Sequence, residues 1–197
     1  MSLGFGREGG SRNFRFSTLD SEASATVSSE EGHLDPLADA LRLHRHGMQR
    51  AGFFLRAESF FNVASYLTKL DDHRKWIAYG GTPLHRMSHG EAFIALARNR
   101  FSPGSLYLLD EPEAALSATR QLALIALLHD LLEEHSDTQF IIATHSPILL
   151  AFPSAQILSF NDGRIKETAY RDTDPYLITR RFLDDPSRVL RELFSDG

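Results

Sequence analysis

The sequence predicts an α/β fold in which a mainly parallel central sheet is flanked by helices. The first observation is the order strand, helix, strand at residues 105–110, 117–134 and 139–144, because strands joined through a helix run parallel. The second is the apolar run at residues 106–109, which is typical of a central strand covered on both faces. The third is the turn Asn161-Asp162-Gly163, which predicts a C-terminal hairpin.

Local signals predict the remaining elements. We expect residues 139–144 to form a second buried strand and the helix at 117–134 to be apolar around most of its circumference. Residues 17–33 are rich in Ser, Thr and Glu and are predicted to form a mobile loop. We expect the whole chain, residues 1–197, to be a single domain. Further strands are predicted at residues 13–17, 53–57, 156–160 and 164–169, and further helices at residues 35–47, 59–70, 88–100, 175–183 and 186–194.

Composition narrows the classes of function. Of the 197 residues, 42% are hydrophobic and 24% are charged, as in ordinary globular proteins. The formal net charge of -5 argues against a globally basic nucleic-acid binder, although a local nucleic-acid or protein contact stays open. The absence of cysteine excludes disulfides and cysteine-based zinc sites. The longest apolar segment, residues 122–128, is too short for membrane insertion, and we expect a cytoplasmic protein.

Two adjacent carboxylates follow the central strand. Asp110 and Glu111 come directly after the apolar run, and ligands of open α/β sheets bind at the carboxyl ends of the strands. Asp110 can hold Mg²⁺ directly or through water, and Glu111 can orient or deprotonate an attacking water. Taken alone, the pair is better explained as a solvated turn at a strand end.

A histidine and a helix start accompany this acid pair. Because parallel strands end at the same edge, we expect His145 to share a crevice with Asp110 and Glu111, where it can contact a phosphate or the attacking water. A capping or core-edge histidine is the structural alternative. The run Ser88-His89-Gly90-Glu91 forms a capping box, which explains it structurally. A helix N-terminus also binds anions, and Gly90 permits close approach of a phosphate.

Three ordered motifs resemble those of ABC-type P-loop ATPases. They are Ser-x-Gly-Glu at residues 88–91, Leu-Leu-Asp-Glu-Pro at 108–112 and Ala-Thr-His-Ser-Pro at 143–147. The longer phrases YLLDEPEAALS and FIIATHSPILLAFP are similar to those of the bacterial "predicted ATPase" group of AAA-family ATPases. The resemblance spans most of residues 4–194. It implies a P-loop NTPase-like, ABC ATPase-type layered fold, with ATP and Mg²⁺ as ligands.

The resemblance also implies roles for individual residues. Asp110 matches the Walker B aspartate that holds the metal, Glu111 the catalytic glutamate, and His145 the switch histidine. Glu58 falls where a Q-loop glutamine is expected. Residues that match the nucleotide-contacting signature are Ser88, His89, Gly90 and Glu91.

The signature contacts nucleotide held by a partner subunit, so the resemblance implies a homodimer through the signature and D-loop surfaces. The D-loop corresponds to residues 114–117. His89 replaces the usual signature glycine and Ser117 the usual D-loop aspartate, which leaves the details of subunit coupling open.

The phosphate-binding loop G-x-x-x-x-G-K-[ST] does not occur in the 197 residues. The run Gly4-Phe5-Gly6-Arg7-Glu8-Gly9 has the form G-x-G-x-x-G, but no strand precedes it and we interpret it as a glycine-rich turn. The resemblance therefore implies an ATPase domain that is truncated at its N-terminus and lacks Walker A. Alone, it is expected to be inactive. The alternative is a non-catalytic interaction module that retains the ATPase scaffold.

Overall fold

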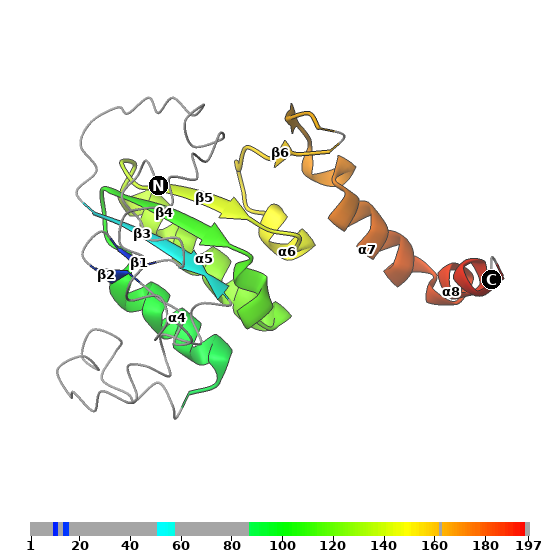
Figure 1. Cartoon of the computed structure of the whole chain (residues 1–197), viewed down its shortest axis with the longest axis horizontal. Helices are drawn as coiled ribbons and strands as arrows, with labels where there is room; N and C mark the ends of the chain where they lie inside the picture. Colours follow the sequence, from blue (N-terminus) through cyan, green and yellow to red (C-terminus); the bar gives the residue numbers. More distant parts are fainter. Residues whose placement is uncertain (1–9, 12–13, 16–50, 58–86, 162, 196–197) are drawn as a thin grey trace, which may run out of the picture. The chain divides into compact units, whose positions relative to one another are not determined.

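The computed structural model describes residues 10–11, 14–15, 51–57, 87–161 and 163–195, in two compact units, residues 1–143 and 144–197. The first unit contains a five-stranded sheet in the order β2-β1-β3-β4-β5 (Figure 1). Strands β3, β4 and β5 run parallel, and β1 runs antiparallel to both of its neighbours. The strands are β1 (Gly10–Ser11), β2 (Phe14–Arg15), β3 (Ala51–Arg56), β4 (Ser105–Asp110) and β5 (Gln139–Ala143).

Two α-helices pack against each other and flank this sheet (Figure 1). They are α4 (His89–Arg100) and α5 (Ala118–Glu134), and the short 3₁₀ helix η3 (Pro112–Ala115) lies between β4 and α5. Each α-helix begins at a serine that caps it, Ser88 for α4 and Ser117 for α5. Apolar side chains from the sheet and from the two helices form the core. Its most deeply buried members are Leu55, Phe93, Leu96, Tyr107, Leu109 and Leu124.

The prediction of a parallel strand-helix-strand unit is confirmed. The strand β4 has the predicted bounds and lies between β3 and β5, as expected for a continuous apolar run. The predicted helices at 88–100 and 117–134 differ from α4 and α5 only in that their first residues are the caps. The predictions at 17–33, 35–47 and 59–70 lie outside the described residues.

The prediction of a buried strand at residues 139–144 was wrong. Strand β5 is not buried, since the exposed fraction of Ile141 is 53%. Among the described strands β5 pairs only with β4, so its apolar residues lie at an edge. Helix α5 buries only one stripe, in which Leu124 and Leu128 lie one turn apart, while Leu122 is 58% exposed. Burial depends on which elements cover a residue, and apolar composition does not determine that.

The second unit consists of a short antiparallel pair of strands and several helices. The strands β6 (Leu158–Ser159) and β7 (Lys166–Glu167) lie within the segments predicted to form a hairpin, and they are shorter than predicted. The helices are α6 (Pro147–Leu150), the 3₁₀ helix η4 (Tyr170–Asp172), α7 (Asp174–Asp184) and α8 (Pro186–Ser195). Within the part of the chain that the structure describes, no helix is both long and apolar enough to cross a membrane.

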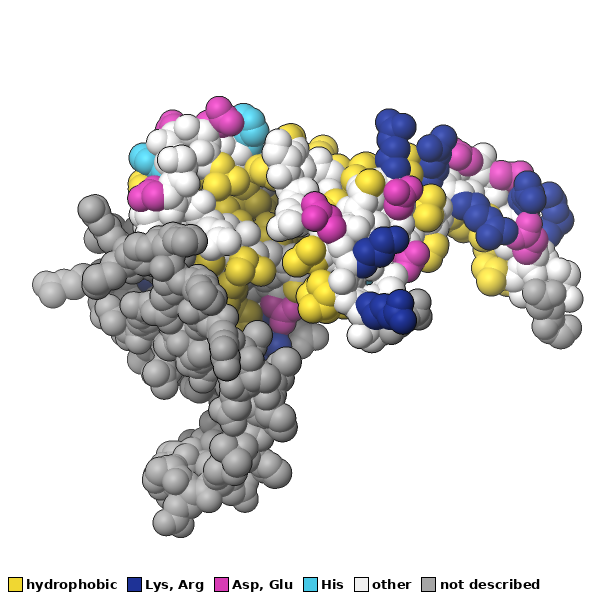
Figure 2. All heavy atoms as spheres, turned by 90° about the horizontal axis from the view of Figure 1, so that it is seen from above, with side chains coloured by type: hydrophobic (Ala, Val, Ile, Leu, Met, Phe, Trp, Pro, Cys, Tyr) yellow, Lys and Arg dark blue, Asp and Glu magenta, His cyan; other side chains and the backbone are white. Residues whose placement is uncertain are grey.

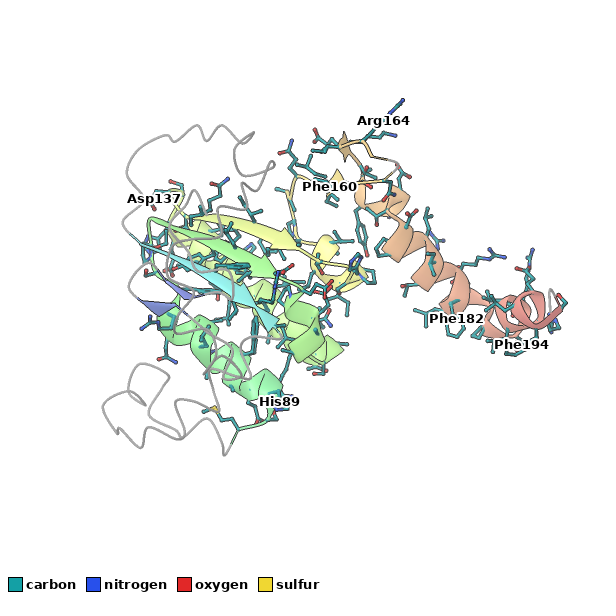
Figure 3. The ribbon with its side chains drawn as sticks, in the orientation of Figure 1. His89, Asp137, Phe160, Arg164, Phe182 and Phe194 are labelled. Carbon is teal, nitrogen blue, oxygen red and sulfur yellow. The ribbon has the colours of Figure 1, made fainter. Side chains whose placement is uncertain are left out.

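Helices α7 and α8 bury none of their residues. Arg181 on α7 forms an ion pair with Glu192 on α8, which joins the two helices. Their aromatic side chains remain accessible to solvent, with Phe182 41% and Phe194 78% exposed (Figure 3). On these helices charged and hydrophobic side chains lie next to one another (right-hand end of Figure 2).

Candidate functional site

The carboxyl end of β4 carries the first predicted site residue. Asp110 is the last residue of β4, and its register partners are Arg56 on β3 and Ala143 on β5. The Nε of Arg56 donates a hydrogen bond to Oδ2 of Asp110 at 2.9 Å. The exposed fractions are 43% for the Arg56 side chain and 31% for the Asp110 side chain. This carboxylate is therefore accessible to solvent at the carboxyl end of the central strand, and a positive charge lies next to it.

Glu111 has an unusual backbone conformation. Its φ is 47° and its ψ is 52°, which lies in the left-handed region that residues other than glycine rarely adopt. The backbone N–H of Glu111 donates to the carbonyl of Ala143 at 2.9 Å, and its carbonyl accepts from the N–H of Ala114 at 3.0 Å. The next residue, Pro112, is buried. These contacts fix the backbone of an exposed glutamate at the end of the central strand, and such strained positions are concentrated at functional sites.

The predicted capping box at the start of α4 is confirmed. The backbone N–H of Ser88 donates to Oε2 of Glu91 at 2.7 Å, and Oγ of Ser88 accepts from the backbone N–H of Glu91 at 3.4 Å. The other carboxylate oxygen of Glu91, Oε1, accepts from Nη2 of Arg120 on α5 at 2.8 Å. The hydrogen bonds from Ser88, followed by the positive charge of Arg120, lower the pKa of Glu91 below its ordinary value. Glu91 therefore ties the start of α4 to the start of α5.

Gly90 is buried, and neighbouring residues of the same chain occupy the space beside it. A Cβ at this position would lie 2.6 Å from Cδ of Arg120 and 3.1 Å from the carbonyl oxygen of Ala115. Close packing within the chain is therefore sufficient to explain this glycine. The segment 88–91 and the segment 114–117 thus lie side by side in one chain.

The other predicted site residues are less closely defined. His89 is exposed at the first turn of α4 (Figure 3). His145 is exposed, lies two residues after the end of β5 and belongs to the second unit. Glu58 lies outside the described residues. A shared site of His145 with Asp110 and Glu111 stays a prediction.

The donors at the end of β4 suit a magnesium ion that is shared with phosphate. Among the described residues there is no group of three or more His, Cys, Asp or Glu side chains that could hold a metal ion. Magnesium is usually bound through one or two carboxylates together with substrate phosphates and water. Asp110, followed by Glu111, provides carboxylates of this kind. The Arg56 guanidinium at Oδ2 of Asp110 also indicates that a cation can be accommodated there.

Sequence reasoning missed Arg56 and Arg120. A charged residue at the end of the apolar strand at 53–57 was the available signal for Arg56, because parallel strands end at the same edge. No local pattern predicts the contact of Arg120 with Glu91, which are 29 residues apart.

Comparison with known protein families gives one match. Residues 46–151 match the family described as "AAA domain, putative AbiEii toxin, Type IV TA system". Searches of curated proteins and of solved structures gave no match. The matched segment includes β3, α4, β4, α5 and β5, which contain the three-stranded parallel sheet and its flanking helices. Because the match covers more than half of the 197 residues, the chain belongs to this AAA-domain family of P-loop ATPase-like proteins.

Proposed function

We propose that this chain is an ABC-like ATPase subunit, which binds and hydrolyses Mg-ATP at an interface between two copies. The observation that carries the proposal is the pair Asp110-Glu111 at the carboxyl end of the central parallel strand, with Glu111 held in a left-handed conformation. Open α/β sheets bind ligands at this edge. Membership of the AAA-domain family supports nucleotide binding.

Each acidic residue has a separate role in this proposal. Asp110 would hold Mg²⁺, directly or through water, and a metal held there would supply positive charge to neutralise the phosphate oxygens. Glu111 hydrogen-bonds the attacking water and accepts its proton as the water oxygen bonds to the γ-phosphorus. The bond between the γ-phosphorus and its bridging oxygen breaks, which gives ADP and inorganic phosphate. The fixed backbone of Glu111 supports this role because a water-positioning group has to be pre-oriented.

The remaining residues act on the terminal phosphate and on the partner copy. His145 contacts the γ-phosphate, and Glu58 takes the position of the Q-loop residue. The helix start at Ser88, His89, Gly90 and Glu91 completes the site of the second copy. Support for the anion-binding role comes from the backbone N–H groups at the N-terminus of α4. Because Gly90 packs against Ala115, the proposed signature and D-loop surfaces would move together.

Hydrolysis in this proposal needs a phosphate-binding loop, and no G-x-x-x-x-G-K-[ST] occurs in the 197 residues. That loop supplies the backbone cradle for the phosphates, a lysine and a hydroxyl for the metal. We therefore expect the 197 residues alone to hydrolyse ATP at background rate. A longer form of the chain that carries such a loop is expected to hydrolyse ATP.

The test is a steady-state ATPase assay on both forms. In the form with the loop, Glu111→Gln is expected to lower kcat by roughly 10²- to 10⁴-fold, as for loss of a general base. The exposed residue Glu133 provides a matched control, because Glu133→Gln makes the same change in charge in the last turn of α5. Robust hydrolysis by the 197 residues alone, abolished by Glu111→Gln, would contradict the requirement for the loop.

The alternative function is a nucleotide-independent interaction module. The observation that favours it is the same missing loop. The two proposals differ in whether a loop-bearing form of the chain binds ATP. An ATPase subunit binds ATP in that form, whereas an interaction module does not. Equilibrium binding of a fluorescent ATP analogue to that form distinguishes them.

A further inference from the structure

The ion pair between Arg56 and Asp110 connects the ends of two parallel strands. The two residues are register partners, so their side chains lie on the same face of the sheet. The contact is a single hydrogen bond from Nε of Arg56 to Oδ2 of Asp110, at 2.9 Å. The guanidinium carbon of Arg56 also lies 6.0 Å from the centroid of the Phe54 ring. The positive charge is thus held at the carboxylate by its register and by an aromatic ring.

We propose that Arg56 is the resident counter-ion of Asp110 and competes with a divalent cation for this carboxylate. This inference rests on the proposed function, in which Asp110 holds the metal. A guanidinium stays protonated at every physiological pH, so it cannot leave the carboxylate by losing its proton. A metal that binds through Oδ2 therefore has to displace the side chain of Arg56. Arg56 thereby lowers the affinity of Asp110 for the metal and slows the binding of the metal.

The exposure of the pair makes this displacement feasible. With 43% of the Arg56 side chain exposed, the guanidinium can move into solvent without being buried elsewhere. Ion pairs of this exposure contribute little to folding. Replacing Arg56 is consequently expected to leave the fold intact while it removes a competitor from Asp110. A purely structural ion pair would behave differently, because its loss would leave metal affinity unchanged.

The test measures binding of Mn²⁺ alone, as a substitute for Mg²⁺, to the full chain by the electron paramagnetic resonance signal of the free ion. Arg56→Gln is expected to tighten the Kd for Mn²⁺ by about 2- to 5-fold, the range that an exposed ion pair can account for. Arg56→Lys keeps the charge and is expected to change the Kd less. The charge-matched control is Arg188→Gln, which removes a 3.0 Å Arg-Glu pair on α8 and is expected to leave the Kd unchanged.

The role of Asp110 is tested separately with Asp110→Asn. This substitution is expected to weaken Mn²⁺ binding and to abolish the tightening caused by Arg56→Gln in the double variant. Suppose that Asp110→Asn weakens Mn²⁺ binding but Arg56→Gln leaves the Kd unchanged or raises it. Competition between Arg56 and the metal is then overturned, while the metal role of Asp110 stands. If Asp110→Asn has no effect, the metal role of Asp110 is overturned together with the inference. Circular dichroism spectra of all variants verify that the helices are retained.

Discussion

At the scale of single residues, Glu111 adopts a backbone conformation that lowers the stability of the fold. This indicates that the placement of its side chain at the end of β4 matters more than that cost. A left-handed conformation costs a residue with a Cβ about 1–2 kcal/mol, and glycine avoids this cost. We predict that Glu111→Gly raises the free energy of unfolding by up to about 1 kcal/mol, because the gain is partly offset by the greater freedom of glycine in the unfolded chain. Glu111→Gln keeps the Cβ and is expected to leave the free energy of unfolding unchanged.

Urea unfolding followed by circular dichroism measures both variants of Glu111. A decrease in the stability of Glu111→Gly below that of the natural chain would contradict the strain argument. It would indicate that the Glu111 side chain makes contacts that outweigh the cost of its backbone conformation.

At the scale of elements, the start of α4 depends on the charge of Glu91. The hydrogen bonds from Ser88 and the positive charge of Arg120 lower its pKa. A carboxyl group whose pKa is lower in the folded state stabilises the fold above its unfolded pKa of about 4.3. That contribution is lost as the pH falls through the folded-state value. Acid conditions should therefore weaken the cap of α4 and its ion pair with α5.

We predict that the thermal midpoint of the natural chain falls more steeply between about pH 5 and pH 3 than that of Glu91→Gln. The variant has no carboxylate to protonate at this position, so this part of its pH dependence is absent. Differential scanning calorimetry at matched ionic strength measures the difference, with Glu133→Gln as the control for removal of an exposed glutamate from α5. Parallel curves for the natural chain and Glu91→Gln would show that the cap does not depend on the charge.

Elements were predictable from the sequence where neighbouring residues determine them. The bounds of β4 follow from an uninterrupted apolar run, and the start of α4 follows from Ser88 and Glu91, which are three residues apart. The exposure of β5 was not predictable, because it depends on which strands pair with β5 and not on its own residues. The contact between Arg56 and Asp110 spans 54 positions, so it could be inferred only from the common end of two parallel strands and not from neighbouring residues.

At the scale of the whole molecule, the proposed mechanism needs two copies of the chain to complete each ATP site. Within one copy, Glu91 contacts Arg120 and Gly90 packs against Ala115. The proposed signature and D-loop surfaces therefore lie next to each other in each copy, which suits a symmetric interface that uses the same patch on both subunits. A substitution that prevents hydrolysis should trap this interface, because ATP then stays bound between the copies.

The shared ATP site is tested by the mass of the Glu111→Gln variant, in the loop-bearing form, measured by light scattering coupled to size-exclusion chromatography. With saturating Mg-ATP we expect this variant to be a dimer. Without nucleotide, or with Ser88→Arg added to obstruct the signature surface, we expect a monomer. An ATP-saturated Glu111→Gln variant that remains monomeric would contradict the shared site.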